Sequence, residues 1–234
     1  MNQEQFIQAL LDKGITLTSK QLEQFENYYQ TLVEWNQKMN LTAITQKEDV
    51  YLKHFYDSLT ISFDYALSNQ SLCDVGAGAG FPSIPLKIVY PELKVTIVDS
   101  LSKRITFLNH LIQVLDLKDV DAISARAEEY AVKHRESFDI VTARAVARLN
   151  ILDELCLPLV KVDGDFITLK GLKAQEELQE AKQGIEKLGG KVMKQESFTL
   201  TDENDHRCNI YIHKVKNTPI QYPRDFSRIK KKPL

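Results

Sequence analysis

Three glycines spaced two residues apart, Gly76, Gly78 and Gly80, are the part of the sequence best suited to bind a small molecule. The apolar run 71–75 before them predicts a short strand, and Pro82–Tyr90 after them predicts a helix with proline in its first turn. A strand, a glycine loop and a helix in this order form the nucleotide-binding turn of doubly wound α/β sheets. Glycine lets the backbone approach a ligand where a Cβ atom would collide with it.

The spacing of these glycines favours a ligand without phosphates. Dinucleotide-binding loops read G-x-G-x-x-G and point helix N–H groups at a pyrophosphate. Here the loop reads G-x-G-x-G and is followed by bulky Phe81 and by Pro82, which has no N–H group to donate. We therefore predict S-adenosylmethionine as the cofactor. Asp99, followed by Ser100, ends the next predicted strand and lies at the distance from Asp74 expected of an acid that binds ribose hydroxyls.

Basic residues follow the later strands of the predicted sheet. Arg126 comes after the third strand, Arg144 after the fourth and Lys170 after the fifth. Ligands of such sheets bind beyond the carboxyl ends of the strands, so we expect these three side chains on one rim. A rim of arginine and lysine suits a polyanionic substrate better than a small neutral one.

Several motifs of other enzymes are absent from the sequence. After the fourth strand there is neither the Asn/Asp-Pro-Pro-Tyr/Phe motif of amine methylases nor the Pro-Cys of cytosine C5 methylases. A Gly-Lys-Ser/Thr phosphate loop and a Gly-x-Ser-x-Gly elbow are also missing. Methylation of guanine N7 would explain why no motif for a catalytic general base follows the fourth strand, because N7 carries an in-plane lone pair and no proton. Catalysis would then reduce to alignment and to accommodation of the moving charge.

An all-helical start precedes a regular alternation of strands and helices. Residues 1 to about 68 show helical periodicity, with capping boxes at Thr18–Gln21 and Thr45–Glu48. The alternation that follows predicts a doubly wound, parallel sheet with an antiparallel pair of strands at one edge. Strands are expected near 71–75, 94–99, 120–124, 138–142, 164–169, 191–200 and 208–215. Helices between them are expected near 82–90, 102–116, 127–134, 150–160 and 174–188.

Composition argues against several classes of protein. The three cysteines are odd in number and scattered, which fits a reducing cytoplasm and no disulfide framework. The five histidines show no metal-ligand spacing with cysteine, so we expect no metal. No apolar run approaches the ~20 residues of a membrane span, and the polar N-terminus lacks the features of a signal peptide. We expect a cytoplasmic protein with no membrane partner.

The sequence closely resembles the bacterial 16S rRNA guanine-N7 methyltransferases, once called glucose-inhibited division protein B. The matching segments are Trp35-Asn36, Asn40-Leu41-Thr42, His54–Ser58, Asp74–Pro82, Ala143–Ala145 and Leu169–Gly171. The resemblance implies a class I, Rossmann-like fold that uses S-adenosylmethionine. It also implies that the substrate is a guanine in a 16S rRNA loop near the decoding centre of the small ribosomal subunit.

The resemblance further implies roles for single residues. It places against the cofactor Gly76, Phe81, Ala127, Glu128 and Arg144. It places on the substrate side Asn40, Arg126 and Lys170. Arg144 is expected to bind the substrate as well, and Arg144 and Arg126 are the candidates for a catalytic role.

Some of these residues also have a structural interpretation. Asn40 lies near a helix end, where asparagine is commonly a C-cap, so a cap and a substrate contact are both open. His54 and Asp57 are three residues apart, which favours a structural hydrogen-bonded pair on one helical face over an acid–base pair. Trp35 is expected in the core.

The chain of 234 residues divides into three parts in this interpretation. They are a helical extension at 1–68, a methyltransferase domain at 69–216 and a basic tail at 217–234. The net charge is only −2, but the tail carries Arg224, Arg228 and a run of lysines against one acid. It fits either an RNA contact or a solvated terminus.

Three other functions stay open. A nicotinamide dehydrogenase would also use Asp99, but its loop should read G-x-G-x-x-G. A small-molecule methyltransferase would leave the basic rim unexplained. An RNA-binding module without turnover could use the same basic surface.

Overall fold

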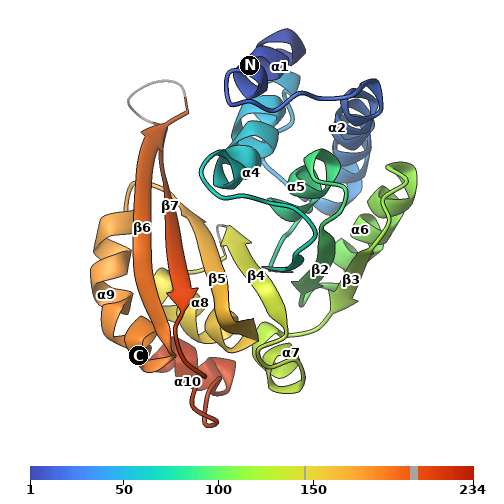
Figure 1. The fold of residues 1–234 in the computed structure, drawn as a ribbon. Helices are drawn as coiled ribbons and strands as arrows, with labels where there is room; N and C mark the ends of the chain where they lie inside the picture. Colours follow the sequence, from blue (N-terminus) through green and yellow to red (C-terminus); the bar gives the residue numbers. More distant parts are fainter. Residues whose placement is uncertain (145, 201–204) are drawn as a thin grey trace.

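The strands form one mixed sheet of seven, in the order β3-β2-β1-β4-β5-β7-β6 (Figure 1). The computed structural model describes residues 1–144, 146–200 and 205–234. The strands are β1 (Ser71–Val75), β2 (Lys94–Asp99), β3 (Val120–Ser124), β4 (Phe138–Arg144), β5 (Val160–Lys170), β6 (Gly190–Thr199) and β7 (His206–Lys214). β1 to β5 are parallel, and β7 runs antiparallel to both β5 and β6. The predicted doubly wound sheet with an antiparallel edge pair is confirmed.

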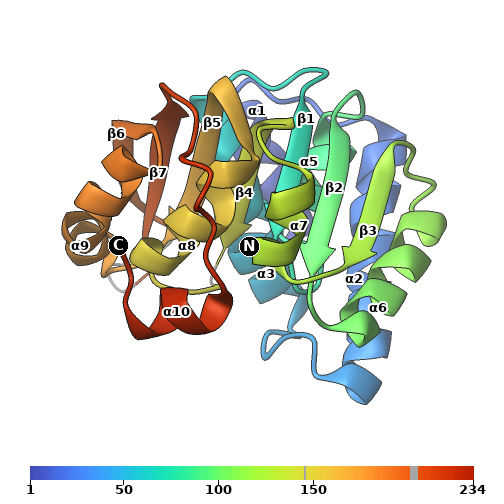
Figure 2. The same ribbon diagram turned by 90° about the horizontal axis from the view of Figure 1, so that it is seen from below.

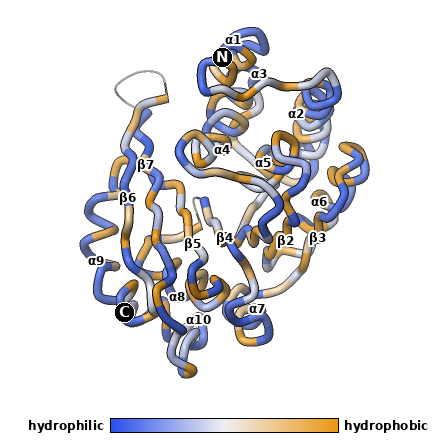
Figure 3. The backbone as a smooth tube through the Cα atoms, in the orientation of Figure 1, coloured by the Kyte–Doolittle hydropathy of each residue, from blue (hydrophilic) through white to orange (hydrophobic). Residues whose placement is uncertain are grey.

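Helices cover both faces of this sheet (Figure 2). The helices after β1 are α5 (Ser83–Val89), α6 (Ser102–Val114), α7 (Ala127–Lys133), α8 (Leu149–Cys156), α9 (Ala174–Lys187) and α10 (Phe226–Lys231). One core contains residues of α5 and α6 together with the N-terminal helices, and a second core contains residues of α7, α8, α9 and α10. α9 is largely hydrophilic (Figure 3), and its buried residues recur at helical spacing on the side that faces the sheet.

One predicted boundary is wrong. The helix expected near 150–160 ends at Cys156 and gives way to a 3-10 turn at Leu157–Leu159. Pro158 cannot continue an α-helix, because it lacks the N–H group and its ring clashes with the preceding turn. β5 therefore begins at Val160 rather than near 164.

The N-terminal segment is helical, as expected. Its α-helices are α1 (Gln3–Leu11), α2 (Ser19–Met39), α3 (Lys47–Val50) and α4 (Asp57–Leu59), with a π-helical stretch at Tyr51–Tyr56 between the last two. Thr18 and Gln21 form the predicted capping box. The box predicted at Thr45 is not formed, because α3 starts after Gln46 and has no side-chain cap. Asn40 is the C-cap of α2 with a left-handed backbone (φ 49°), which confirms its structural role.

Aromatic rings join the N-terminal helices to the glycine loop. Phe25 and Tyr28 of α2 pack against Phe55, and Tyr28 also stacks on Phe81 at 5.4 Å between ring centroids. The buried Tyr28 hydroxyl donates to the carbonyl of Ala79 at 2.6 Å. Trp35 contacts the rings of Phe107 and His110 on α6, at the edge of the same core. The predicted parts 1–68 and 69–216 thus share a core.

The C-terminal segment, residues 217–234, is folded onto the second core. Ile229 of α10 is fully buried, while the lysines Lys230 and Lys231 are exposed. Within the described part of the chain, no helix is long and apolar enough to cross a membrane. The same described residues contain no group of acids, histidines and cysteines placed to hold a metal ion. Cys73, Cys156 and Cys208 are buried free thiols.

We predict that Tyr28→Phe lowers the free energy of unfolding by about 1–3 kcal/mol, because it leaves the buried Ala79 carbonyl without its hydroxyl donor. Urea unfolding measures the change. Tyr29→Phe is the matched control, since the Tyr29 hydroxyl makes only a partly buried contact of 3.3 Å and its loss should cost less than ~1 kcal/mol. Equal losses in the two variants would contradict the role given to Tyr28.

Candidate functional site

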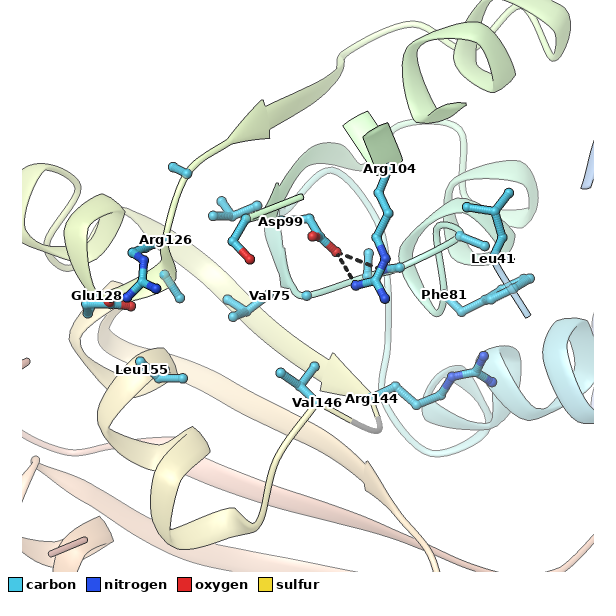
Figure 4. Close-up of a pocket in the computed structure, with 18 of the residues that line it drawn as sticks. Leu41, Val75, Phe81, Asp99, Arg104, Arg126, Glu128, Arg144, Val146 and Leu155 are labelled. Atoms are coloured by element: carbon cyan, nitrogen blue, oxygen red, sulfur yellow. Dashed lines mark hydrogen bonds and ion pairs between the residues drawn. The ribbon is translucent and has the colours of Figure 1, made fainter. Parts of the chain in front are cut away.

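A cavity of about 460 Å³ opens at the carboxyl ends of β1, β2, β3 and β4 (Figure 4). The ends of these four strands, the loops that follow them and the first turns of α6 and α7 form most of its wall. The rest comes from the N-terminal segment, from α8 and from the C-terminal segment, through Leu41, Thr42, His54, Leu155 and Phe226. Its position is the one at which doubly wound sheets bind their ligands, and its volume is in the usual range for small-molecule sites.

The glycine loop follows β1 and needs glycine at each of its three positions. Gly76, Gly78 and Gly80 have φ angles of +74°, +60° and +99°, a region that side chains disfavour. A Cβ atom on Gly78 would have no heavy atom within 4 Å and would project into open space, whereas one on Gly76 would lie 2.7 Å from the Val146 side chain. Gly76 and Gly78 line the cavity, as predicted for a backbone that a ligand approaches.

Gly80, which was predicted to contact the cofactor, packs against Tyr28 and Ile84 instead. A Cβ atom there would lie 2.8 Å from both the Tyr28 hydroxyl and a side-chain carbon of Ile84. The glycine lets α2 pack against the loop, and Gly80 is not among the cavity-lining residues. Its position therefore lends no support to the predicted contact with the cofactor.

Asp99 is buried at the end of β2, with its carboxylate toward the cavity (Figure 4). One oxygen accepts the backbone N–H of Leu101 at 2.9 Å. The other accepts from Arg104 of α6 at 3.1 Å and from the Gly78 N–H at 3.3 Å. This carboxylate fixes the distance between the two loops, and a ribose hydroxyl at this point would share it with Arg104. Ser100 lies beside it in the cavity wall.

Asp74, which precedes the glycine loop in β1, holds the helix that follows the loop. It is fully buried, and one carboxylate oxygen accepts the backbone N–H of Ser83 at the start of α5 at 3.1 Å. Burial raises the pKa of Asp74 to about 7. Its contact with α5 orients the helix that follows the glycines.

Arg144, at the end of β4, is held at the other side of the cavity from Arg126 (Figure 4). Its side chain is 13% exposed and donates to Asp57 at 3.0 Å and to the backbone carbonyl of Lys53 at 3.2 Å. The guanidinium also lies 4.9 Å from the centre of the Phe81 ring, in cation–π geometry. Phe81 and Arg144, both predicted to bind the cofactor, therefore contact each other and line the same part of the cavity.

His54 is neutral in this arrangement. Its Nδ1 lies 3.1 Å from the Arg144 guanidinium and 3.2 Å from the carbonyl oxygen of Lys53. Nε2 is hydrogen-bonded to the Thr42 hydroxyl at 2.9 Å. Burial, together with the charge of Arg144, lowers the pKa of His54 to about 3.

The predicted hydrogen bond between His54 and Asp57 is wrong, although both residues are structural. Among the described residues no hydrogen bond joins the two side chains directly, and each of them bonds to Arg144 instead. Asp57 also accepts from Arg207 of β7 at 3.2 Å. Burial raises the pKa of Asp57, against the opposing effect of the two arginines. Neither side chain is free to exchange protons with a substrate.

Arg126, Ala127 and Glu128 line the opposite end of the cavity, after β3. The Arg126 side chain is 57% exposed and lies 3.3 Å from the buried carboxylate of Glu128. Its guanidinium also lies 5.9 Å from the ring of Phe226. Two of the three predicted rim cations, Arg126 and Arg144, thus belong to the cavity.

Lys170 and Asn40 are not part of the cavity wall. The Lys170 ammonium is buried, donates to the Ala147 carbonyl at 2.7 Å and pairs with Glu177 of α9 at 2.9 Å. This arrangement favours a structural role for Lys170 over the predicted place on the rim. Asn40 caps α2 immediately before Leu41 and Thr42, so its link to the site is through the backbone.

Three side chains in or beside the site, those of Arg104, Arg207 and Phe226, were not predicted. Arg104 lies within α6 and Arg207 at the start of β7, and nothing in the sequence nearby marks either as functional. Phe226 belongs to the segment interpreted as a basic tail.

We predict different effects of alanine at two of the loop glycines. Gly78→Ala should fold, at a cost of about 1–2 kcal/mol for its left-handed backbone, and should bind S-adenosylhomocysteine weakly because its methyl group enters the cavity. Gly80→Ala carries a similar strain and also collides with Tyr28 and Ile84, so it should lose more stability. Calorimetric titration and urea unfolding separate the two effects. Wild-type affinity in Gly78→Ala would show that the ligand does not approach this loop.

Comparisons with known proteins identify the family. The family model described as rRNA small subunit methyltransferase G matches residues 21–208. A protein named ribosomal RNA small subunit methyltransferase G from Bacillus cereus (strain B4264) is 60% identical over 227 residues, which cover 96% of this chain and 95% of that protein. A protein of the same name from Bacillus thuringiensis (strain Al Hakam) matches with the same identity and coverage.

Solved structures share the fold at low sequence identity. TYW2 from M. jannaschii, solved in complex with AdoMet, superposes with a TM-score of 0.58 at 17% identity, over 74% of this chain and 79% of that one. A SAM-dependent methyltransferase from Aquifex aeolicus superposes with a TM-score of 0.54 at 17% identity, over 70% and 92% of the two chains. The sequence match and the fold agree: this chain belongs to the rRNA small subunit methyltransferase G family, a family of S-adenosylmethionine-dependent methyltransferases.

Proposed function

We propose that this protein transfers the methyl group of S-adenosylmethionine to N7 of a guanine in 16S rRNA. The observation that carries the proposal is the cavity itself, which joins a glycine loop and a ribose-type carboxylate at one side to a fixed arginine at the other. The relatives at 60% identity are named as methyltransferases of small-subunit ribosomal RNA, which supports the same substrate here.

The residues present fit the cofactor. Open space at Gly78 admits a ligand against the backbone, and the Asp99 carboxylate, which already accepts from Leu101, Arg104 and Gly78, can accept from a ribose hydroxyl as well. Ala127 and Glu128 would hold the adenine end, and Phe81 with Arg144 would border the methyl-bearing end. When bound, S-adenosylmethionine supplies an electrophilic methyl group on its sulfonium sulfur.

The protonation states at the Arg144 end favour a nucleophile that has no proton to lose. His54 stays neutral down to a pH of about 3 and uses both ring nitrogens in hydrogen bonds. The carboxylate of Asp57 is bound by two arginines. The thiols of Cys73 and Cys156 are buried, and burial raises the pKa of each. Guanine N7 suits such a site, because its lone pair attacks without a base.

The remaining task of the site is to hold guanine in line with the methyl group. A guanidinium has five N–H donors, and the bonds of Arg144 to Asp57, Lys53 and His54 leave donors free for a ligand. Arginine is the usual partner of the guanine O6 edge, which adjoins N7. Arg126, exposed at the far end, is placed to meet RNA phosphates. Alignment of this kind can supply a large part of the rate enhancement.

The proposed reaction is tested by mapping the modified base. Small subunits and naked 16S rRNA from cells lacking this protein are incubated with the purified protein and labelled S-adenosylmethionine, and N7-methylguanine is located by strand cleavage at that base. We expect one labelled guanine in 16S rRNA, and no label with Asp99→Ala at limiting cofactor concentration. Label on another atom, or in another RNA, would overturn the assignment.

We predict that no ionisation of His54 affects methyl transfer in a single turnover between pH values of about 6 and 8.5, because the pKa of His54 is about 3; a change near pH 7 would report Asp74, whose pKa is about 7. Rapid-quench measurements with saturating cofactor follow the step. Folded His54→Gln should lose less than about tenfold in rate, the effect of a disturbed Arg144 rather than of a lost base. A loss of several orders of magnitude, with a rate that rises with pH, would make His54 a general base.

A further inference from the structure

We propose that Phe226 is a binding residue for the adenine ring of S-adenosylmethionine and that Arg224 positions it. The inference rests on the proposed function, since it takes S-adenosylmethionine as the ligand of the cavity. It assigns a part in cofactor binding to the C-terminal segment, residues 217–234, which the sequence suggested only as a contact for RNA or as a solvated end.

The order of the strands fixes how an elongated ligand lies in the cavity. β3, β2, β1 and β4 are neighbours in this order, so the loops after them follow one another along the cavity. Figure 4 shows Asp99 between Arg126 with Glu128 on one side and Phe81 with Arg144 on the other. A ribose at Asp99, with the methyl group toward Arg144, directs the adenine ring to the Arg126 end.

The wall at the Arg126 end is mostly apolar and suits a flat ring. Its apolar members are Ala125, Ala127, Leu155 and Phe226. Phe226 is the only aromatic ring at this end among the described lining residues, because Phe81 and His54 both contact Arg144. Contact between a base and an aromatic side chain is a recurring source of affinity for nucleobases.

Phe226 reaches the cavity because the C-terminal segment is anchored on α8. The Arg224 side chain donates to the fully buried carboxylate of Glu154 at 2.8 and 2.5 Å, and the Arg224 backbone N–H donates to it as well. Three residues after Phe226, Ile229 is buried in the second core. Leu155, which follows Glu154 on α8, lines the cavity. One helix therefore holds the segment and borders the site.

Phe226 also lies within cation–π distance of Arg126, whose guanidinium is 5.9 Å from the centre of the Phe226 ring. The ring is half-buried, lines the cavity and packs against the second core. The family model ends at residue 208, so this wall residue lies outside the part of the chain that the model describes.

The test is the affinity for two unreactive ligands, measured by calorimetric titration. S-Adenosylhomocysteine has the whole cofactor skeleton, and 5′-methylthioadenosine lacks the amino acid part. Phe226→Ala should weaken both by a similar factor, roughly tenfold, as expected for the loss of one base–aromatic contact. Ile220→Ala is the matched control in the same segment, because Ile220 is 84% exposed and does not line the cavity. It should bind both ligands like the wild type.

Equal affinities of the wild type and of folded Phe226→Ala for both ligands would overturn the inference and leave the proposed function intact. No binding of S-adenosylhomocysteine by the wild type would overturn the proposed cofactor and this inference together. A Phe226→Ala variant that loses affinity for S-adenosylhomocysteine but not for 5′-methylthioadenosine would place the ring at the amino acid end, which also contradicts the assignment.

Arg224 is tested as a positioning residue by a double-mutant cycle. Arg224→Gln should weaken binding of 5′-methylthioadenosine in the wild-type background and should have little further effect in the Phe226→Ala background, because the ring through which it acts is gone. Thermal unfolding without ligand checks that each variant is folded. An equal loss in the two backgrounds would show that Arg224 does not act through Phe226.

Discussion

The buried guanidinium of Arg144 ties the N-terminal helices to the end of β4, and the cavity depends on this contact. A buried cation must be paired, since one left without partners is strongly destabilising. Asp57, His54 and the Lys53 carbonyl provide the partners, and all three come from the N-terminal segment. Because the arginine is on the sheet and its acceptors are on the helices, the pairing holds the two layers together at the mouth of the site.

The chemistry of the site follows from the same pairing. Burial and the charge of Arg144 keep His54 neutral, and the arginine also pairs with the carboxylate of Asp57, so the two groups that could act as acid or base have structural roles. What the cavity offers to the reacting atoms is a fixed cation, a stacked aromatic wall at Phe81 and a backbone open at Gly78. Such a site favours a reaction that needs orientation more than proton transfer.

Local patterns in the sequence predicted the sheet, the glycine loop and Asp99, because spacing and periodicity encode them directly. Contacts between distant segments were not predictable in this way. Position 80 must be glycine because the Tyr28 hydroxyl packs against it. Phe226 reaches the cavity because Arg224 binds Glu154. Lys170 ends its strand as predicted, but a place at a strand end does not show where the side chain points, and Glu177 of α9 draws the ammonium away from the rim.

The coupling free energy between the Arg144 and Asp57 side chains is the most direct test of the central role of Arg144. It is obtained from the free energies of unfolding of Arg144→Gln, Asp57→Asn and the double variant, relative to the wild type. We expect a coupling of at least about 2 kcal/mol, because each single change removes one charge of a buried ion pair: Arg144→Gln leaves the Asp57 carboxylate with Arg207 alone, and Asp57→Asn leaves the Arg144 guanidinium with uncharged acceptors only. Single effects that add to within about 0.5 kcal/mol would show that the two layers are held together by other contacts and would contradict the central place given to Arg144.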